Sequence, residues 1–290
     1  MIFNMFKTAI LLIILSGLLA LIGGIIGGVS GIQVALFISL LMNGIMFFFS
    51  DRIVLNMYNA QPLNKQNYGW IYDIVEELSQ KMNIPMPKLW LVITPMANAF
   101  ATGRSPKHSS IAVTTGILNL LDAEELRGVL AHELAHIKNR DTLITTIAAT
   151  FASAIGHLAY MLRHMALWGS INNDRRKENP FVLVIVSILM PFAATLVQLA
   201  ISRSREYSAD DTGARCSHSP LALACALQKL ENNVKHAHMN TEDMQQTSTA
   251  SLFIVHPFAG HSLSSLFATH PPMSQRIARL HKLSQKMFSK

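Results

Sequence analysis

The residues best suited to chemistry in this sequence are the two histidines and the glutamate of His132-Glu133-Leu134-Ala135-His136. Two histidines four residues apart on an α-helix lie almost one above the other, so both imidazoles can reach one metal ion. Two ligands from one rigid turn leave room for a third protein ligand and a water. Glu133 projects beside them, where its carboxylate can take a proton from that water. This is the zinc-protease signature on a helix, although a helix with two histidines on one face by chance has the same spacing.

The motif is predicted to lie on a helix with a buried face. Asp122 is expected to be the N-cap, and Glu125 three residues later completes a capping box. A helix that carries a catalytic zinc site is also expected to be amphipathic, with apolar side chains along one face. Apolar residues recur at helical spacing through and beyond the first turn, at Leu126, Val129, Leu130, Leu134 and Ile137.

A carboxylate that can complete such a site lies downstream, in residues 202–210. Glu206 and Asp210 are four residues apart and therefore share one helix face. Glu206 is well placed to supply the third ligand of a two-histidine, one-glutamate zinc site. Asp210 can then hold a histidine ring by its other nitrogen. Taken alone, the pair would more often be a solvated charged face, but beside a zinc motif we favour the functional interpretation.

The composition indicates a membrane protein. Half of the 290 residues are hydrophobic and 14% are charged, against about 25% charged in an ordinary soluble domain. Residues 8–50, 142–162 and 179–202 carry no charge, and apolar runs of about 20 residues match the bilayer core. The net charge of +7 is spread without a Lys/Arg block, which disfavours nucleic-acid binding. Two cysteines, Cys216 and Cys225, exclude a disulfide framework and fit a reducing compartment.

We expect about four hydrophobic helices, which divide the catalytic part of the chain in two. Residues 1–50 are predicted to form an N-terminal transmembrane helical hairpin, because a second apolar run follows the first too closely for a cleaved signal peptide. Residues 51–141 form the first part of the catalytic domain, with the zinc helix. Residues 142–201 form the third and fourth hydrophobic helices, which either span the bilayer or pack as a buried or re-entrant pair. Residues 202–290 form the second part, with the third zinc ligand.

A small sheet is expected before the zinc helix. Leu89–Ile93 and Ile111–Val113 are typical of strands, and the stretch Asn98–Gly103 between them alternates weakly. A sheet edge beside a zinc helix is where a protease can hold an extended peptide by strand addition, although an ordinary edge hairpin fits the pattern as well. The candidate substrate-binding residues are Asn98, Ala99, Phe100 and Ala101. Further helices are predicted over Tyr68–Met82 and Pro220–Leu230, with a polar loop over 231–250.

Together these features resemble the HtpX family of membrane zinc endopeptidases, which are relatives of the Ste24 prenyl-protein proteases. The resemblance covers nearly the whole chain and is weakest over residues 231–262. It is carried by the N-terminal hydrophobic pair, Asn98–Gly103, the motif at 132–136, the two later apolar runs, residues 202–210, and Thr269-His270-Pro271-Pro272 with Arg276.

The resemblance implies one zinc ion per chain, bound by His132, His136 and Glu206, with Glu133 as the catalytic base. The fold class that follows is a mostly α membrane protein with a gluzincin-like α+β catalytic domain, in which a small sheet lies beside zinc-binding helices. The resemblance also implies a multi-pass enzyme of the bacterial inner membrane, whose active site faces the cytoplasm. Its substrates would be misfolded or damaged membrane proteins or other unfolded polypeptides, cut in stress-linked quality control.

The positive charges support that orientation in part. Residues 51–141 and 202–290 together carry 19 Lys/Arg, and four spans would place both on one side of the membrane. The positive-inside tendency makes that side the cytoplasm, although Arg175-Arg176-Lys177 on the opposite loop weakens the signal. The oligomeric state and the natural substrates stay open.

His270 is a further candidate for catalysis. Peptide hydrolysis builds negative charge on the carbonyl oxygen, and a second donor beside the zinc can stabilise it. The segment Thr269-His270-Pro271-Pro272 resembles the family's downstream His-Pro segment, whose histidine lies close to the zinc. The alternative is that His270 merely precedes the last helix, where Thr269 is also a good cap.

Two other functions remain open at this point. One is a non-catalytic membrane scaffold with a structural metal site, which Glu133 argues against because structural sites usually close with four protein ligands. The other is a narrow processing protease of the Ste24 type, which the motifs do not distinguish from a broad one.

Overall fold

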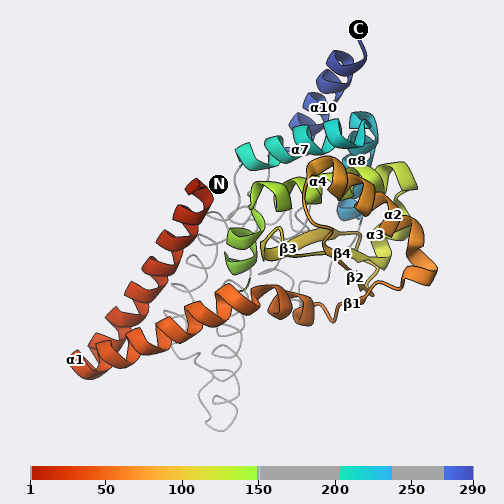
Figure 1. Cartoon of the computed structure of the whole chain (residues 1–290). Helices are drawn as coiled ribbons and strands as arrows, with labels where there is room; N and C mark the ends of the chain where they lie inside the picture. Colours follow the sequence, from red (N-terminus) through yellow and green to blue (C-terminus); the bar gives the residue numbers. More distant parts are fainter. Residues whose placement is uncertain (1, 149, 151–202, 237–270, 290) are drawn as a thin grey trace, which may run out of the picture.

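The computed structural model describes residues 2–148, 150, 203–236 and 271–289 (Figure 1). This part of the chain is mostly helical and contains one four-stranded sheet. The third and fourth predicted hydrophobic helices fall largely outside the described residues, and so does His270.

The N-terminal helix α1 (Ile2–Met57) bends sharply within its glycine-rich stretch. Gly27 and Gly28 leave helical geometry, and Gly28 has a φ of 58°, which a residue without a side chain adopts at little cost. The two arms meet through polar side chains: Ser39 Oγ lies 2.5 Å from Ser16 Oγ. Asn43 Nδ2 donates to Ser16 Oγ at 2.9 Å. Of the residues described, Gly27–Ile45 form the one helical segment long and apolar enough to cross a membrane.

The helix α1 does not end at residue 50, where the predicted hairpin stops, but continues to Met57. Val54 and Leu55 are buried in this extension and pack with Phe100 of the sheet. Burial of these two apolar side chains against the sheet stabilises the added helical turns, and the helix is longer for this reason.

The sheet has the strand order β1-β2-β4-β3, so β3 is an edge strand. β2 and β4 are parallel, whereas β3 pairs with β4 in the antiparallel sense. The predicted strands at Leu89–Ile93 and Ile111–Val113 correspond to β2 and β4. The weakly alternating stretch Asn98–Gly103 corresponds to β3. Of the four strands of this sheet, the short β1 was not predicted. The strand bounds are β1 Gln61–Pro62, β2 Lys88–Val92, β3 Ala99–Ser105 and β4 His108–Thr114.

The helices that bear chemistry pack on the face of the sheet opposite to the end of α1 (Figure 1). The zinc helix, α4 (Ala123–Asn139), begins with the predicted capping box of Asp122 and Glu125. All five apolar residues predicted for its buried face are fully buried, so this prediction is confirmed. The other helices are α2 (Lys65–Met82), α3 (Thr115–Leu120), α7 (Arg203–Ser217), α8 (Pro220–His236) and α10 (Met273–Phe288).

The predicted loop after Leu230 is wrong over its first residues, because α8 continues to His236. Val234 lies in this added part and packs against the main core. An apolar contact on the buried face thus outweighs the polar composition of the segment. The rest of the predicted loop, residues 237–250, lies outside the described residues.

Candidate metal centre

Two helices from distant parts of the sequence meet at the zinc motif. At Gly213 of α7 an added Cβ would lie 2.8 Å from the backbone nitrogen of His132, so only glycine permits this approach to α4. The contact brings Glu206 and Asp210, earlier on α7, against the histidine-bearing face of α4. Both carboxylates are buried, and so is His132.

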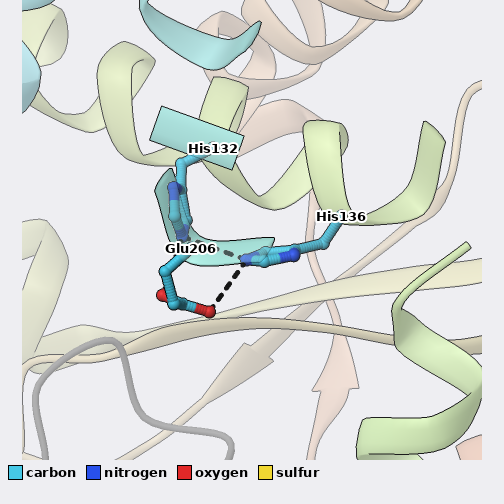
Figure 2. A group of neighbouring side chains, drawn as sticks. All are labelled: His132, His136 and Glu206. Carbon is cyan, nitrogen blue, oxygen red and sulfur yellow. Dashed lines mark hydrogen bonds and ion pairs between the residues drawn. The ribbon is translucent and has the colours of Figure 1, made fainter. Parts of the chain in front are cut away.

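The three expected ligands point toward one another, as Figure 2 shows. His132 Nε2 lies 3.2 Å from His136 Nε2. Glu206 Oε1 lies 3.5 Å from His136 Nε2, and Glu206 Oε2 lies 3.8 Å from His132 Nε2. All three donors fall within 4.8 Å of one another. Tetrahedral zinc with bonds of about 2.0–2.2 Å places neighbouring donors roughly 3.3–3.6 Å apart, so the side chains fit this metal.

Each histidine ring is held from behind by a carboxylate. His136 Nδ1 lies 3.1 Å from Asp141 Oδ2, and His132 Nδ1 lies 3.0 Å from Asp210 Oδ1. The second contact is a close ion-pair approach rather than a well-aligned hydrogen bond. A proton kept on Nδ1 leaves the Nε2 lone pair free, so both rings could serve as metal ligands.

Asp141 was not among the predicted site residues. It lies five residues after His136, and the chain between them turns back at Arg140, which caps α4 with a φ of 58°. The signal in the sequence is therefore an acidic residue just past the helix end, which has meaning only once that turn is known.

Without a bound metal, burial opposes the charged form of His136. Asp141, Glu206 and Glu133 outweigh burial and raise the pKa of His136 to about 9.

Arg276 on α10 is a second residue at the site that was given no role in the prediction, although it is among the residues that carry the family resemblance. It is fully buried and binds Asp210 with two hydrogen bonds, from Nε at 2.8 Å and from Nη2 at 2.6 Å. Its Nη1 also lies 3.4 Å from Glu206 Oε2. The available signal was an arginine on the face of an amphipathic helix that also carries the buried Met273 and Leu280.

Charge pairing, not burial, decides the ionisation of this network. Burial by itself would raise the pKa of Asp210, but Arg276 and His132 lower it well below its usual range. Burial likewise opposes the charge of Arg276, yet Asp210, Glu206 and Glu133 keep its pKa raised. Asp210 therefore stays charged at neutral pH, paired with the charged guanidinium of Arg276.

Glu133 faces the edge of the sheet. Its Oε2 accepts a hydrogen bond of 2.8 Å from the backbone N–H of Ala101, on β3. Burial raises the pKa of Glu133, and the two histidines act against this shift. A carboxylate with a raised pKa and a fixed orientation is suited to accept a proton and to give it back.

The four candidate residues on the edge segment have different surroundings, although all are buried. Ala101 is tied to Glu133, while Phe100 packs on the opposite face of the sheet. The backbone of Asn98 is bonded to Thr114 on β4. The structure thus brings Ala101 to the site and turns the side chain of Phe100 away from it.

Comparison with known proteins gives the family. The model of peptidase family M48 matches residues 65–284. The chain belongs to peptidase family M48. It is similar to the "Protease HtpX homolog" of Aquifex aeolicus (strain VF5), with 50% identity over 94% of this chain and 90% of the relative. It is also similar to the protein of that name from Pyrococcus furiosus, with 47% identity over 97% of this chain and 96% of the relative.

Membership of family M48 confirms the expected class of enzyme. The chain is a zinc-dependent endopeptidase of the membrane, and the resemblance to the HtpX proteases holds over nearly its full length. A solved structure of Ste24p from S. mikatae has 18% identity and a TM-score of 0.46, over 96% of this chain and 65% of that one. Similarity at this level does not establish a common fold.

Proposed function

We propose that the chain cuts peptide bonds at a zinc ion held by His132, His136 and Glu206, with Glu133 as catalytic base. The observation that carries the proposal is the convergence of the three ligand atoms within 4.8 Å, with the Glu133 carboxylate fixed beside them. Zinc bound there supplies a Lewis acid that activates a water and polarises the scissile carbonyl.

Glu133 moves the proton. Its carboxylate takes a proton from the attacking water as the water oxygen bonds to the carbonyl carbon. The same group then delivers that proton to the amide nitrogen as the carbon–nitrogen bond breaks. The N–H of Ala101 holds the carboxylate in place, and burial of Glu133 favours its protonated form midway through the reaction.

The surrounding charges position the ligands. Asp141 and Asp210 orient the two rings, and Arg276 clamps Asp210 while it lies beside Glu206. A site built in this way meets the ion with its ligands already placed, which lowers the reorganisation needed on binding.

The substrate is proposed to add as a strand along β3, over residues Asn98–Ala101. Support comes from the position of β3 at the sheet edge, with Ala101 directly bonded to the base. Pairing there would bring a peptide bond next to Glu133. His270, which lies outside the described residues, is proposed to donate a hydrogen bond to the developing oxyanion.

For cellular context we propose a multi-pass inner-membrane enzyme with its active site in the cytoplasm. In this arrangement the regions are an N-terminal hairpin (1–50), two catalytic segments (51–141 and 202–290) and an intervening apolar pair (142–201). Misfolded membrane proteins are the proposed substrates, because a metal site that adjoins apolar runs can meet chains that leave the bilayer. Narrow processing of the Ste24 type is the alternative, and cleavage of a peptide library in detergent would separate the two.

The test of the catalytic proposal is Glu133→Gln. This change keeps the shape of the side chain and its bond from Ala101 but removes the base, so we expect full zinc content and no cleavage of a casein-type substrate. Glu124→Gln is the matched control, since Glu124 lies exposed on the same helix. Cleavage by Glu133→Gln within a few-fold of wild type would exclude Glu133 as the base.

A further inference from the structure

An open cavity of about 420 Å³ lies between the end of α4 and the beginning of α7. Its lining is strongly basic, with Lys138 and Arg140 from the first segment and Arg205 from the second. Ser204 and Ser208 also line it. The volume is within the range of about 300–1,000 Å³ that small-molecule sites occupy. Cations and hydroxyl donors around one cavity suit a phosphate group.

One carboxylate also lines the cavity, and its charge is already engaged. Asp141 is buried and lies 3.1 Å from His136 Nδ1. The three cations Lys138, Arg140 and Arg205 outnumber this one carboxylate, so the lining carries a net positive charge that favours an anion.

The position of the cavity along the chain suggests where that anion comes from. Residues 138–141 directly precede the uncharged run 142–162, and residues 204–208 follow the uncharged run 179–202 almost at once. If both runs enter the bilayer, as the proposed function requires, the cavity lies at the depth of the lipid phosphates. No residue of β3 lines it, so it is separate from the proposed path of an extended peptide.

We propose that this cavity binds the phosphate group of an anionic phospholipid, next to the metal centre. Lys138, Arg140 and Arg205 would pair with the phosphate, and the hydroxyls of Ser204 and Ser208 would donate hydrogen bonds to it. The site rests on the proposed membrane topology, not on the proposed roles of the zinc ligands.

The backbone at Arg140 permits a clean test. This residue caps α4 with a φ of 58°, a conformation that suits glycine better than arginine. Arg140→Gly should thus remove the cation without loosening the helix end. Lys138→Gln, at an exposed position, removes a second charge. Arg215→Gln is the control, because it removes an exposed cation of α7 that pairs with Asp211 and does not line the cavity.

The experiment measures binding of radiolabelled dihexanoyl-phosphatidylglycerol to the full-length, zinc-loaded protein in detergent. We expect saturation at one lipid per chain, with dihexanoyl-phosphatidylcholine and inorganic phosphate as weaker competitors. Lys138→Gln with Arg140→Gly should raise the half-saturating concentration roughly 10–30-fold, and Arg215→Gln should not change it. If the double variant loses zinc or aggregates, Arg140→Gly alone should still give a several-fold loss.

Four results would overturn the proposal. Binding that is not saturable, or equal in wild type and in Arg140→Gly, would assign the lipid to the apolar helices. Inorganic phosphate as strong a competitor as the lipid would make this a free-anion site. An acetylated dipeptide that competes as strongly as the lipid would show that the cavity binds the carboxylate of a peptide. Zinc content and cleavage, measured on the same samples, separate these outcomes from a failure of the catalytic proposal.

Discussion

The two histidines of the proposed metal centre are held by different kinds of structure. His132 is almost completely buried and faces Asp210, which Arg276 clamps from a third helix. The side chain of His136 is 15% exposed and faces Asp141, which directly follows the cap of its own helix. One half of the site therefore depends on the packing of α4, α7 and α10, whereas the other depends on a local turn of the chain.

This difference predicts where the site is easily damaged. A buried ion pair that loses one partner leaves an uncompensated charge, and the cost is large. The His136 side chain is partly exposed, so water can compensate in part for the loss of Asp141. Substitutions on the His132 side should consequently cost more than equivalent ones on the His136 side.

Glu206 joins the two halves, and its loss should have the largest effect. Glu206→Ala leaves two histidines as the only protein ligands of the described site, so we expect most of the zinc to be lost during dialysis against a weak chelator. The measurement is zinc per chain by metal analysis. Asp211→Ala on the exposed side of the same helix is the control and should retain zinc. Unchanged zinc in Glu206→Ala would point to a different third ligand.

Arg276→Met should have the next largest effect, because it leaves the buried carboxylate of Asp210 without its charged partner. We expect destabilisation of about 3–5 kcal/mol, seen as a lower melting temperature in detergent. Arg279→Met tests the specificity of this effect, since Arg279 is exposed on the same helix and stacks on Tyr207. Equal melting temperatures for the two variants would show that the Arg276–Asp210 pair does not stabilise the packing around His132.

The sharpest test of the comparison is the pair Asp210→Asn and Asp141→Asn. Loss of a carboxylate behind a metal-binding histidine typically weakens metal affinity about 10–100-fold. Asp210→Asn should lie at the upper end, because it also leaves Arg276 without its bidentate partner. Asp141→Asn should lie at the lower end. Competition with a chromogenic chelator gives both affinities, and the reverse order would refute the distinction drawn between the two halves.

The two halves also differ in how far the sequence could predict them. The zinc helix was predictable because its signals are local: a capping box, a helical apolar stripe and two histidines four residues apart. Glu206 followed from the number of ligands that a catalytic zinc needs, and Asp210 from its spacing to Glu206. None of these steps requires knowledge of which helices pack together.

The rest of the site required tertiary information. Arg276 lies 66 residues from Asp210, and nothing in the sequence near either residue indicates that they pair. Asp141 reaches His136 only because the chain turns back at Arg140. The continuation of α1 past residue 50 and of α8 past Leu230 has the same origin, since Val54, Leu55 and Val234 extend those helices by packing on distant elements.

The atoms that bind the metal are the most direct test of the proposed centre. X-ray absorption at the zinc edge of the purified full-length protein should show two imidazoles at about 2.0–2.1 Å and oxygen ligands at about 2.0–2.2 Å, with no sulfur. A third imidazole, or a sulfur at about 2.3 Å from Cys216 or Cys225, would contradict a centre made of His132, His136 and Glu206.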